Sequence, residues 1–242
     1  METTETIRVS LVLNGTVMQR AAGLKKRILD RAAHFFFELG YSRVTTAEIA
    51  AELGISKKTL YKLFPSKMLL LRSVIRRELR GVASQMETIL GDKDSDFYIK
   101  IERIFGLASH QIVKMSRVFR KDVYRSAPEI WVEIDDFRRR FFLKRLGTLI
   151  SEGVKEGIVR ADVDERLIIL LHQLVMENII NPEQLQRLSV NPLEMFEAMI
   201  RMLYGGILAE KAREKFFRYE NSRRADAGSA GSTVGAETDV GS

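Results

Sequence analysis

The chain of 242 residues contains no cysteine, only 4 prolines and only 3 histidines. Without cysteine there can be no disulfide framework, no thiolate nucleophile and no zinc site with cysteine ligands. No apolar run approaches the roughly 18 residues that a membrane span needs. No basic region precedes an apolar stretch at the N-terminus, which argues against a secretory signal. We therefore expect no membrane partner.

The remaining composition is that of a globular protein, with 45% hydrophobic and 29% charged residues. This balance excludes wholesale disorder, and the length suits one large domain or two smaller ones. Of the 16 glycines, 4 lie beyond residue 226, so the body of the chain has few residues that break helices. Together these features favour a mostly helical fold.

The net charge of +7 is concentrated in one segment. Between Gly23 and Arg77 there are twelve Lys or Arg residues and four acidic ones, a net charge of +8, which leaves −1 for the rest of the chain. Such a local excess of positive charge is typical of modules that bind polyanions. A solvated charged face would give the same count, so charge alone leaves both interpretations open.

Apolar residues recur with the helical period from Leu24 onward, and the period-2 alternation of strands is absent. We therefore expect an all-α fold in two parts, a three-helix N-terminal unit and a larger C-terminal helical domain. Thr45 and Glu48 form a capping box, and Gly54 and Ser56 separate two short helices. The expected helices are 24–39, 46–53, 57–63, a long helix after Ser66, and roughly 96–114, 118–125, 128–152, 163–181 and 192–219.

The two ends of the chain are expected to be unstructured. Residues 1–22 are polar and aperiodic apart from a hairpin signal at Asn14-Gly15, and an isolated hairpin is marginal in water. We therefore expect a disordered arm there, with Met18 open as an alternative start that intact-protein mass would test. Residues 221–242 are rich in Gly, Ser, Ala and Thr and are expected to form a flexible tail.

The segment from Thr45 to Phe64 has the spacing of a helix-turn-helix motif. Its first helix packs through Ile49, Ala50 and Leu53, and its second buries Leu60 and Phe64. Polar side chains then cluster on the open face of the second helix, whose N-terminal part reads base edges in the major groove in such motifs. A generic helical hairpin has no need of so many hydrogen-bond donors, so the pattern favours binding to double-stranded DNA.

The flanking residues extend this motif into a resemblance. From Leu24 to Leu71, about 50 residues, the sequence resembles the DNA-binding domain of TetR/AcrR-type transcriptional regulators. The resemblance is carried by Thr45-Thr46, the run Ile49–Ser56, Thr59-Leu60-Tyr61 and Phe64–Lys67. It implies residues 23–70 as the DNA-binding domain and 71–220 as the regulatory and dimerisation domain. It also implies a cytoplasmic homodimer on a palindromic operator, a repressor released by a small, largely apolar effector and without a cofactor.

Carried over to this chain, the resemblance assigns roles to individual residues. Thr45 or Thr46 would touch a phosphate, Tyr61 would bond one through its hydroxyl, and Lys67 would hold the DNA backbone. Side chains at the start of the second helix would face the bases. The complete expected set of DNA contacts is Thr45, Thr46, Ser56, Lys57, Lys58, Thr59, Tyr61, Lys62 and Lys67.

The same resemblance places an apolar ligand cavity among helices 96–114, 118–125 and 128–152. The expected lining residues are Phe105, Ile112, Phe119, Tyr124, Trp131, Phe137 and Phe141. Each of them could equally fill an ordinary core, although Tyr124 and Trp131 carry polar groups that a buried site must satisfy. The basic cluster at 138–145 favours a solvated face over a contact with an anionic ligand.

The two last helices are similar to the pair that forms the dimer interface of the family. Their apolar residues exceed what one monomer layer needs, and a two-fold operator demands a two-fold protein. The expected interface residues are Leu167, Leu171, Leu174, Val175, Phe196, Met199, Ile200, Leu203 and Ile207.

Enzyme signatures are weak in this sequence. His34, His110 and His172 fall on separate expected helices, and none has a partner at metal-ligand spacing. No phosphate-binding glycine loop or nucleophile elbow occurs. We expect no enzyme and no metal. Three classes stay open: a repressor released by a ligand, a factor of the same fold that acts as an activator or answers to a protein partner, and a helical enzyme with a fused basic arm.

Overall fold

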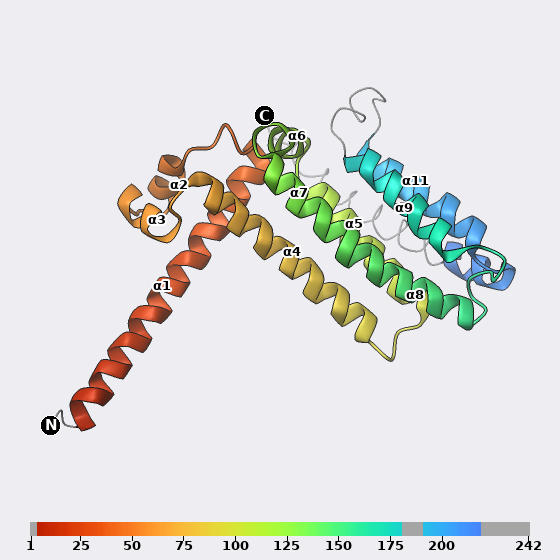
Figure 1. Cartoon of the computed structure of the whole chain (residues 1–242), viewed down its shortest axis with the longest axis horizontal. Helices are drawn as coiled ribbons and strands as arrows, with labels where there is room; N and C mark the ends of the chain where they lie inside the picture. The colour runs from red at the N-terminus through yellow and green to blue at the C-terminus, as the bar shows by residue number, and fades with distance from the viewer. Residues whose placement is uncertain (1–3, 181–190, 219–242) are drawn as a thin grey trace, which may run out of the picture.

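The computed structural model describes residues 4–180 and 191–218, and helices dominate both ranges (Figure 1). The all-α expectation is confirmed, because the only β-type pairing among these residues is a single bridge between Val159 and Leu208. The helices of the N-terminal half are α1 (Thr4–Leu39), α2 (Thr46–Glu52), α3 (Lys57–Leu63), α4 (Lys67–Gly91) and α5 (Phe97–Lys114). Those that follow are α6 (Arg117–Ser126), α7 (Pro128–Phe137), η1 (Arg138–Leu143), α8 (Lys144–Lys155), α9 (Glu165–Ile180) and α11 (Pro192–Ile207).

Helix α1 is longer than the sequence pattern suggested. Residues 4–22, expected to be a disordered arm, are the first part of this helix, which extends away from the rest of the molecule in Figure 1. No proline interrupts the segment, and Gly15 and Gly23 each cost only about 1 kcal/mol in a helix interior. The helix anchored by residues 24–39 therefore propagates toward the N-terminus. The expected tail at 221–242 lies outside the described residues.

One apolar core joins the N-terminal helices to α6 and α7. Ile28 and Phe36 of α1, Ile49 of α2 and Leu60 of α3 pack with Leu71 and neighbouring residues of α4. Phe119, Val123 and Ile130 of α6 and α7 belong to the same cluster. Phe37 meets Phe119 edge to face, with ring centroids 4.9 Å apart, a favoured aromatic geometry.

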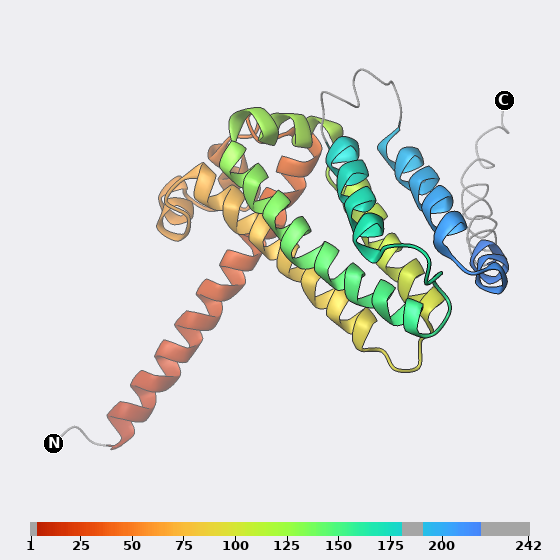
Figure 2. The ribbon, with the colours of Figure 1, turned by 45° about the vertical axis from the view of Figure 1, so that its right-hand side comes forward.

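A second apolar core fills the C-terminal part of the molecule. The C-terminal half of α4 contributes Val82 and Met86, and α5, α8, α9 and α11 supply most of the remainder. Helix α4 therefore crosses the expected domain boundary at 70/71 without a break and takes part in both cores. Figure 2 shows α4 running beside the α7–α8 segment, and this segment leads on to α9.

The expected single helix at 128–152 contains an irregular segment and ends later. Residues Arg138–Leu143 form a π-helical segment between α7 and α8, a feature often found near functional sites. Gly153 does not end the helix; it lies inside α8, where Phe97 packs so closely that a side chain would not fit. The chain turns at Gly157, whose φ of +69° favours glycine.

The expected helix at 192–219 is interrupted. Helix α11 ends at Ile207, and helical structure resumes at 210–218. The break follows from pairing with a distant segment, because Arg160 donates its backbone N–H to Ile207 and Ala209 donates to Ile158, both at 2.9 Å. Among residues 4–180 and 191–218, no helix combines the length and apolar character needed to cross a bilayer.

Candidate functional site

Local hydrogen bonds fix the two short helices of the motif. The side chain of Thr45 accepts from the N–H of Glu48 at 3.2 Å, and the Glu48 carboxylate accepts from the N–H of Thr45 at 2.7 Å. These two bonds form the predicted capping box. The bonds that the Glu48 carboxylate accepts from the backbone N–H and the hydroxyl of Thr45 hold the pKa of this carboxyl below its usual value. Gly54, with φ of +63°, makes the turn, and Ser56 accepts from the N–H of Thr59 at 3.0 Å to begin α3. The local sequence is therefore sufficient to place the start of α3.

Helix α3 presents a basic face to solvent. Leu60 and Phe64 are buried in the core shared with α1 and α4. This orientation leaves the side chains of Lys57, Lys58 and Lys62 exposed, and they lie together on one short helix. Ser56 is also exposed, while Thr59 is half-buried and shares a 2.9 Å hydroxyl bond with Ser56. The expected base-reading residues are thus brought together and are accessible.

The two threonines before α2 have different environments. Thr45 is exposed, whereas Thr46 is buried. The hydroxyl of Thr46 lies 2.9 Å from that of Tyr61 and shares a hydrogen bond with it. Tyr61 keeps 43% of its surface exposed, so this bond orients a tyrosine that still faces solvent. Thr45 is therefore the better placed of the two for a direct phosphate contact, and Thr46 supports Tyr61.

Lys67 does not extend freely into solvent. Its ammonium group lies 4.4 Å from the centre of the Tyr41 ring and donates to the carbonyl of Ser42 at 3.3 Å. Partial burial lowers the pKa of Lys67, and Asp122 and Glu48 act in the opposite direction. The side chain thus anchors the loop between α1 and α2, close to the start of α2.

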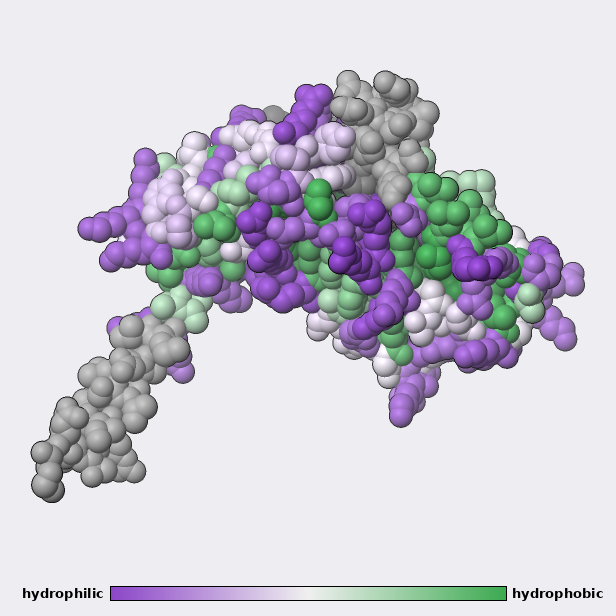
Figure 3. Space-filling model, in the orientation of Figure 1, coloured by the Kyte–Doolittle hydropathy of each residue, from purple (hydrophilic) through white to green (hydrophobic). Residues whose placement is uncertain are grey.

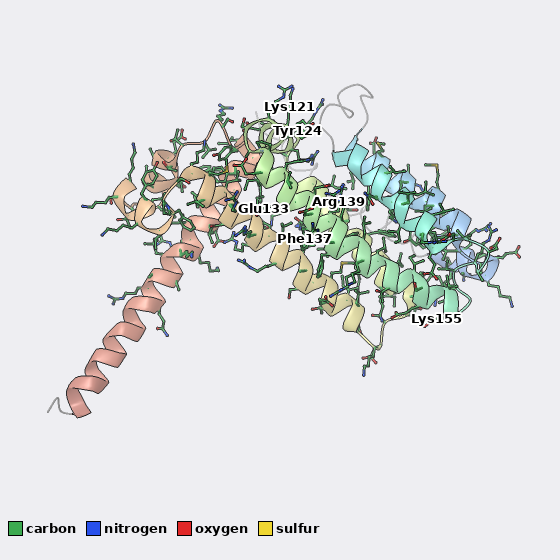
Figure 4. All side chains as sticks on the ribbon, in the orientation of Figure 1. Lys121, Tyr124, Glu133, Phe137, Arg139 and Lys155 are labelled. Atoms are coloured by element: carbon green, nitrogen blue, oxygen red, sulfur yellow. The ribbon has the colours of Figure 1, made fainter. Side chains whose placement is uncertain are left out.

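A cavity of about 120 Å³ lies behind this motif, where α4, α5, α6 and α7 meet. Four of the expected lining residues, Ile112, Phe119, Trp131 and Phe137, do line it. Figure 4 labels Phe137 on the α7 side of this region. The other lining residues are Leu79, Val82, Ala108, Gln111, Met115, Arg120, Val123, Ile134, Arg138 and Phe142.

The three other expected lining residues lie elsewhere. Phe105 is buried in the second core, against Tyr204 at a centroid distance of 4.9 Å. Tyr124 is exposed at the surface of α6 and packs edge-on against Trp131 (Figure 4). Phe141 stacks on Phe137 outside the lining set. Helical period could not separate these positions, because it does not determine which helix each face meets.

Sequence reasoning missed the two arginines of the cavity wall. Arg120 and Arg138 are 7% and 8% exposed, although arginine is rarely buried. A signal was present for Arg120, because it stands within the apolar stripe of α6 between Phe119 and Val123. Arg138 lies in the π-helical segment, which the sequence pattern did not reveal, and it is paired with Asp135.

The residues expected at a dimer interface divide into two groups. Leu167, Leu171 and Leu174 of α9 are 46–55% exposed, and Leu170 of the same helix is 46% exposed. Figure 3 shows hydrophobic surface in the region of α9 and α11. By contrast, the stripe of α11 faces α5 and α9, so it belongs to the monomer's own core. Leu203 is half-buried, and the side chain of Val175 lies outside the described ones. The buried members of the expected set are Phe196, Met199, Ile200 and Ile207.

Comparisons with known proteins agree with this geometry. The family model for bacterial regulatory proteins of the tetR family matches residues 28–74, which hold the helix-turn-helix motif. The nucleoid occlusion factor SlmA of Marinobacter nauticus is 27% identical over 127 residues, which span 52% of this chain and 63% of that relative. Fold, motif and family match together define a regulator that binds DNA through a helix-turn-helix. Residues 28–74 therefore form a DNA-binding domain of the tetR type, and the comparisons support a TetR-type transcriptional regulator.

Solved structures share the fold along most of the chain. A transcriptional regulator from Saccharomonospora viridis in complex with choline has a TM-score of 0.61 at 21% identity, covering 78% of this chain and 100% of that one. The regulator FadR from Bacillus subtilis in complex with stearoyl-CoA has a TM-score of 0.57 at 18% identity, covering 75% and 98%. Members of this family are regulators and not enzymes. Within the described residues, no cluster of three or more His, Asp or Glu side chains could hold a metal ion.

Proposed function

We propose that the chain is a homodimeric regulator that binds a palindromic operator and leaves it when a small, largely apolar molecule enters the cavity. The observation that carries the proposal is the orientation of α3. Its apolar side is fixed in a core by Leu60 and Phe64, and Lys57, Lys58 and Lys62 project on the opposite side. A short exposed basic helix of this kind fits the major groove of duplex DNA. Such a regulator acts in the cytoplasm, where it has access to chromosomal DNA.

Individual contacts follow from the exposed positions. Lys57, Lys58 and Thr59 lie in the first turn of α3 and are assigned to bases or to the groove edge. Thr45, Ser56 and Tyr61 are assigned to phosphates. Lys62 lies in the last turn of α3 and is assigned to the DNA backbone. Lys67 is assigned to the backbone as well, as the family resemblance implies, and its bond to Ser42 holds it near the start of α2.

The homodimer is supported by the apolar face of α9. Leu167, Leu170, Leu171 and Leu174 are spaced as one side of a helix, and each is about half exposed. Contiguous exposed apolar surface of this kind marks an interaction site. A second copy that brings the same face would bury both surfaces and place two α3 helices on one operator.

Release by a ligand is supported by the cavity and by the position of α6 and α7. These helices line the cavity and also belong to the core that holds α1 to α3. A molecule that displaces their side chains therefore acts on the same packed unit that positions the recognition helix. The relatives solved with stearoyl-CoA and with choline show that this fold accommodates small molecules.

A second candidate is a factor of the same fold that responds to no small molecule. It would act as an activator or be controlled by a protein partner. The similarity to a nucleoid occlusion factor favours it, because that name describes no small-molecule effector. Operator selection from genomic fragments, followed by titration with candidate effectors, separates the two. Release of the selected DNA by a small molecule supports the first candidate, and release by a protein partner alone supports the second.

Substitutions on α3 test the DNA interface itself. Lys58→Ala is expected to relax the preference at particular base pairs, by about 1–3 kcal/mol of discrimination. Lys62→Ala is expected to weaken binding to all DNA sequences alike. It should also reduce the slope of log K against log salt concentration by about one unit. Lys155→Ala, at the exposed end of α8 far from α3, serves as the control (Figure 4). Unchanged affinity in both α3 variants would remove α3 from the interface.

A further inference from the structure

The cavity wall combines a carbon surface with buried positive charge. Its polar side chains include Gln111, Arg120 and Arg138, and no acidic residue is among the lining residues. A buried charge is costly unless another charge or a set of hydrogen bonds compensates it. The partners of the two arginines therefore indicate what the cavity is built to hold.

The two arginines differ in their partners. Arg138 forms an ion pair with Asp135, its neighbour one turn earlier. Arg120 has no ion pair with any described residue and is more than nine-tenths buried. Its Nη1 donates to the carbonyls of Ile112 and Met115, at 2.7 and 2.5 Å, at the end of α5. Burial, with the nearby Arg117 cation, lowers the pKa of Arg120.

The hydrogen bonds of Arg120 leave one side of the guanidinium open. Both Nη1 protons are used by α5, and no described residue accepts from Nε or Nη2. An arginine presents these two remaining groups as a fork that matches the two oxygens of a carboxylate. Since the side chain lines the cavity, this fork is the natural position for an anionic group of a bound molecule.

We infer that the cavity takes a compact apolar acid, with its carboxylate on Arg120 and its hydrocarbon part against Phe119, Trp131 and Phe137. This inference rests on the proposed release by a ligand and narrows the class of that ligand. The carboxylate supplies the counter-charge that Arg120 lacks, and the aromatic walls exclude water from the hydrocarbon part. A cavity of about 120 Å³ suits a molecule of one ring or a short chain, because a cavity near 150 Å³ accepts benzene.

The test compares acids with neutral molecules of the same shape. Benzoate and benzyl alcohol, and octanoate and 1-octanol, are titrated into the full-length protein at pH 7.5 by calorimetry. Each acid is expected to bind about tenfold or more tightly than its alcohol, as a charge-assisted hydrogen bond implies. Equal or tighter binding of the alcohols overturns the inference, and so does the failure of both acids to bind at millimolar concentration. This comparison needs no variant.

Variants then assign the preference to one side chain. Arg120→Gln is expected to bring the affinity for each acid down to that of its alcohol, which should itself be unchanged. Arg125→Gln removes the same charge from an exposed position on the same helix and should keep the full preference. If Arg120→Gln is too unstable to titrate, Arg120→Lys keeps the charge and loses the fork, and a reduced preference is again expected. Retention of the full preference in the folded Arg120 variant overturns the inference.

Failure of this inference can be told apart from failure of the proposed function. If the alcohols bind and release the selected operator while the acids do not, the inference fails and ligand release stands. If benzoate binds through Arg120 but the operator stays bound, the proposed release fails and the acid site stands.

Discussion

The carboxylate of Asp122 on α6 accepts two hydrogen bonds from Ser42, one from its backbone N–H and one from its hydroxyl, each at 2.5 Å. Partial burial pushes the pKa of Asp122 upward, but the bonds from Ser42 and Ser126 outweigh it and hold the carboxyl below its usual value. Ser42 lies in the loop before α2, and its carbonyl is also bound by Lys67. The helix that carries Arg120 is therefore tied directly to the loop that begins the helix-turn-helix motif.

Asp122→Asn tests this tie. The variant keeps the size of the side chain but loses the charge that strengthens both bonds, so we expect the free energy of unfolding to fall by about 1 kcal/mol. We also expect a several-fold loss of operator affinity, because Thr45 and α2 follow Ser42 closely. Urea denaturation and DNA titration measure the two effects. Asp94→Asn, in the loop before α5, is the control, and a loss of affinity as large as that of Asp122→Asn would show that charge alone is responsible.

Gly153→Ala tests the close packing of α8. A Cβ at this position would lie 2.5 Å from Phe97 and 2.9 Å from Val159, both of which are buried. We expect a loss of about 1–3 kcal/mol in the free energy of unfolding, as for other overpacked cores. Gly147→Ala lies in the same helix, where its Cβ would meet Ile169 at an ordinary 3.7 Å, and it should stabilise the protein by up to about 1 kcal/mol. Equal midpoints in urea for the two variants would contradict this interpretation.

The buried ring of His172 is expected to make the protein less stable in mild acid. The ring is buried and donates from Nδ1 to the carbonyl of Ile168 at 3.0 Å, while Nε2 has no hydrogen-bond partner. Burial lowers the pKa of His172 to about 4, although the bond to Ile168 favours the charged form. Between pH 6.5 and pH 4 the unfolded chain therefore binds a proton that the folded one excludes, and stability falls as the pH falls. The contribution is about 3 kcal/mol over that range.

His172→Phe keeps the aromatic contact with Phe105 and removes the titrating group. The natural protein should gain stability relative to this variant as the pH rises from 4 toward 7, because only the natural protein carries the buried titrating ring. His34→Gln, an exposed position, should show the natural dependence. A pH dependence in His172→Phe as steep as that of the natural protein would assign the effect to other groups.

Leu171→Glu tests the dimer. The substitution places a charge at the centre of the exposed leucines of α9, where a second copy would bury it, so we expect dissociation to monomers at micromolar concentration. Sedimentation velocity measures the change. Val132→Glu alters an equally exposed apolar residue on α7 and should leave the assembly intact. A natural protein that sediments as a monomer would remove the dimer from the proposed function.

Local sequence was sufficient wherever a structural signal lies within one turn of a helix. Thr45, Gly54 and Ser56 set the bounds of α2 and α3, and the exposed lysines of α3 follow from the burial of Leu60 and Phe64. Features that depend on distant partners were missed. The break after Ile207 depends on pairing with the 158–160 segment, and Gly153 is a close-packing position against Phe97 rather than a helix end. The helical period also could not show that the apolar stripe of α11 turns inward while that of α9 faces outward.

The shared core of α1, α6 and α7 has a consequence for dissecting this protein. A fragment cut after Gly91 would keep all three helices of the motif but would lose Phe119, Val123 and Ile130, which cover Phe37 and its neighbours. The fragment would therefore expose apolar side chains of α1 to solvent and would hold α3 less firmly in place. Helices α6 and α7 complete the core of the helix-turn-helix motif and also line the cavity, so truncation cannot separate the motif from the cavity wall without exposing that core.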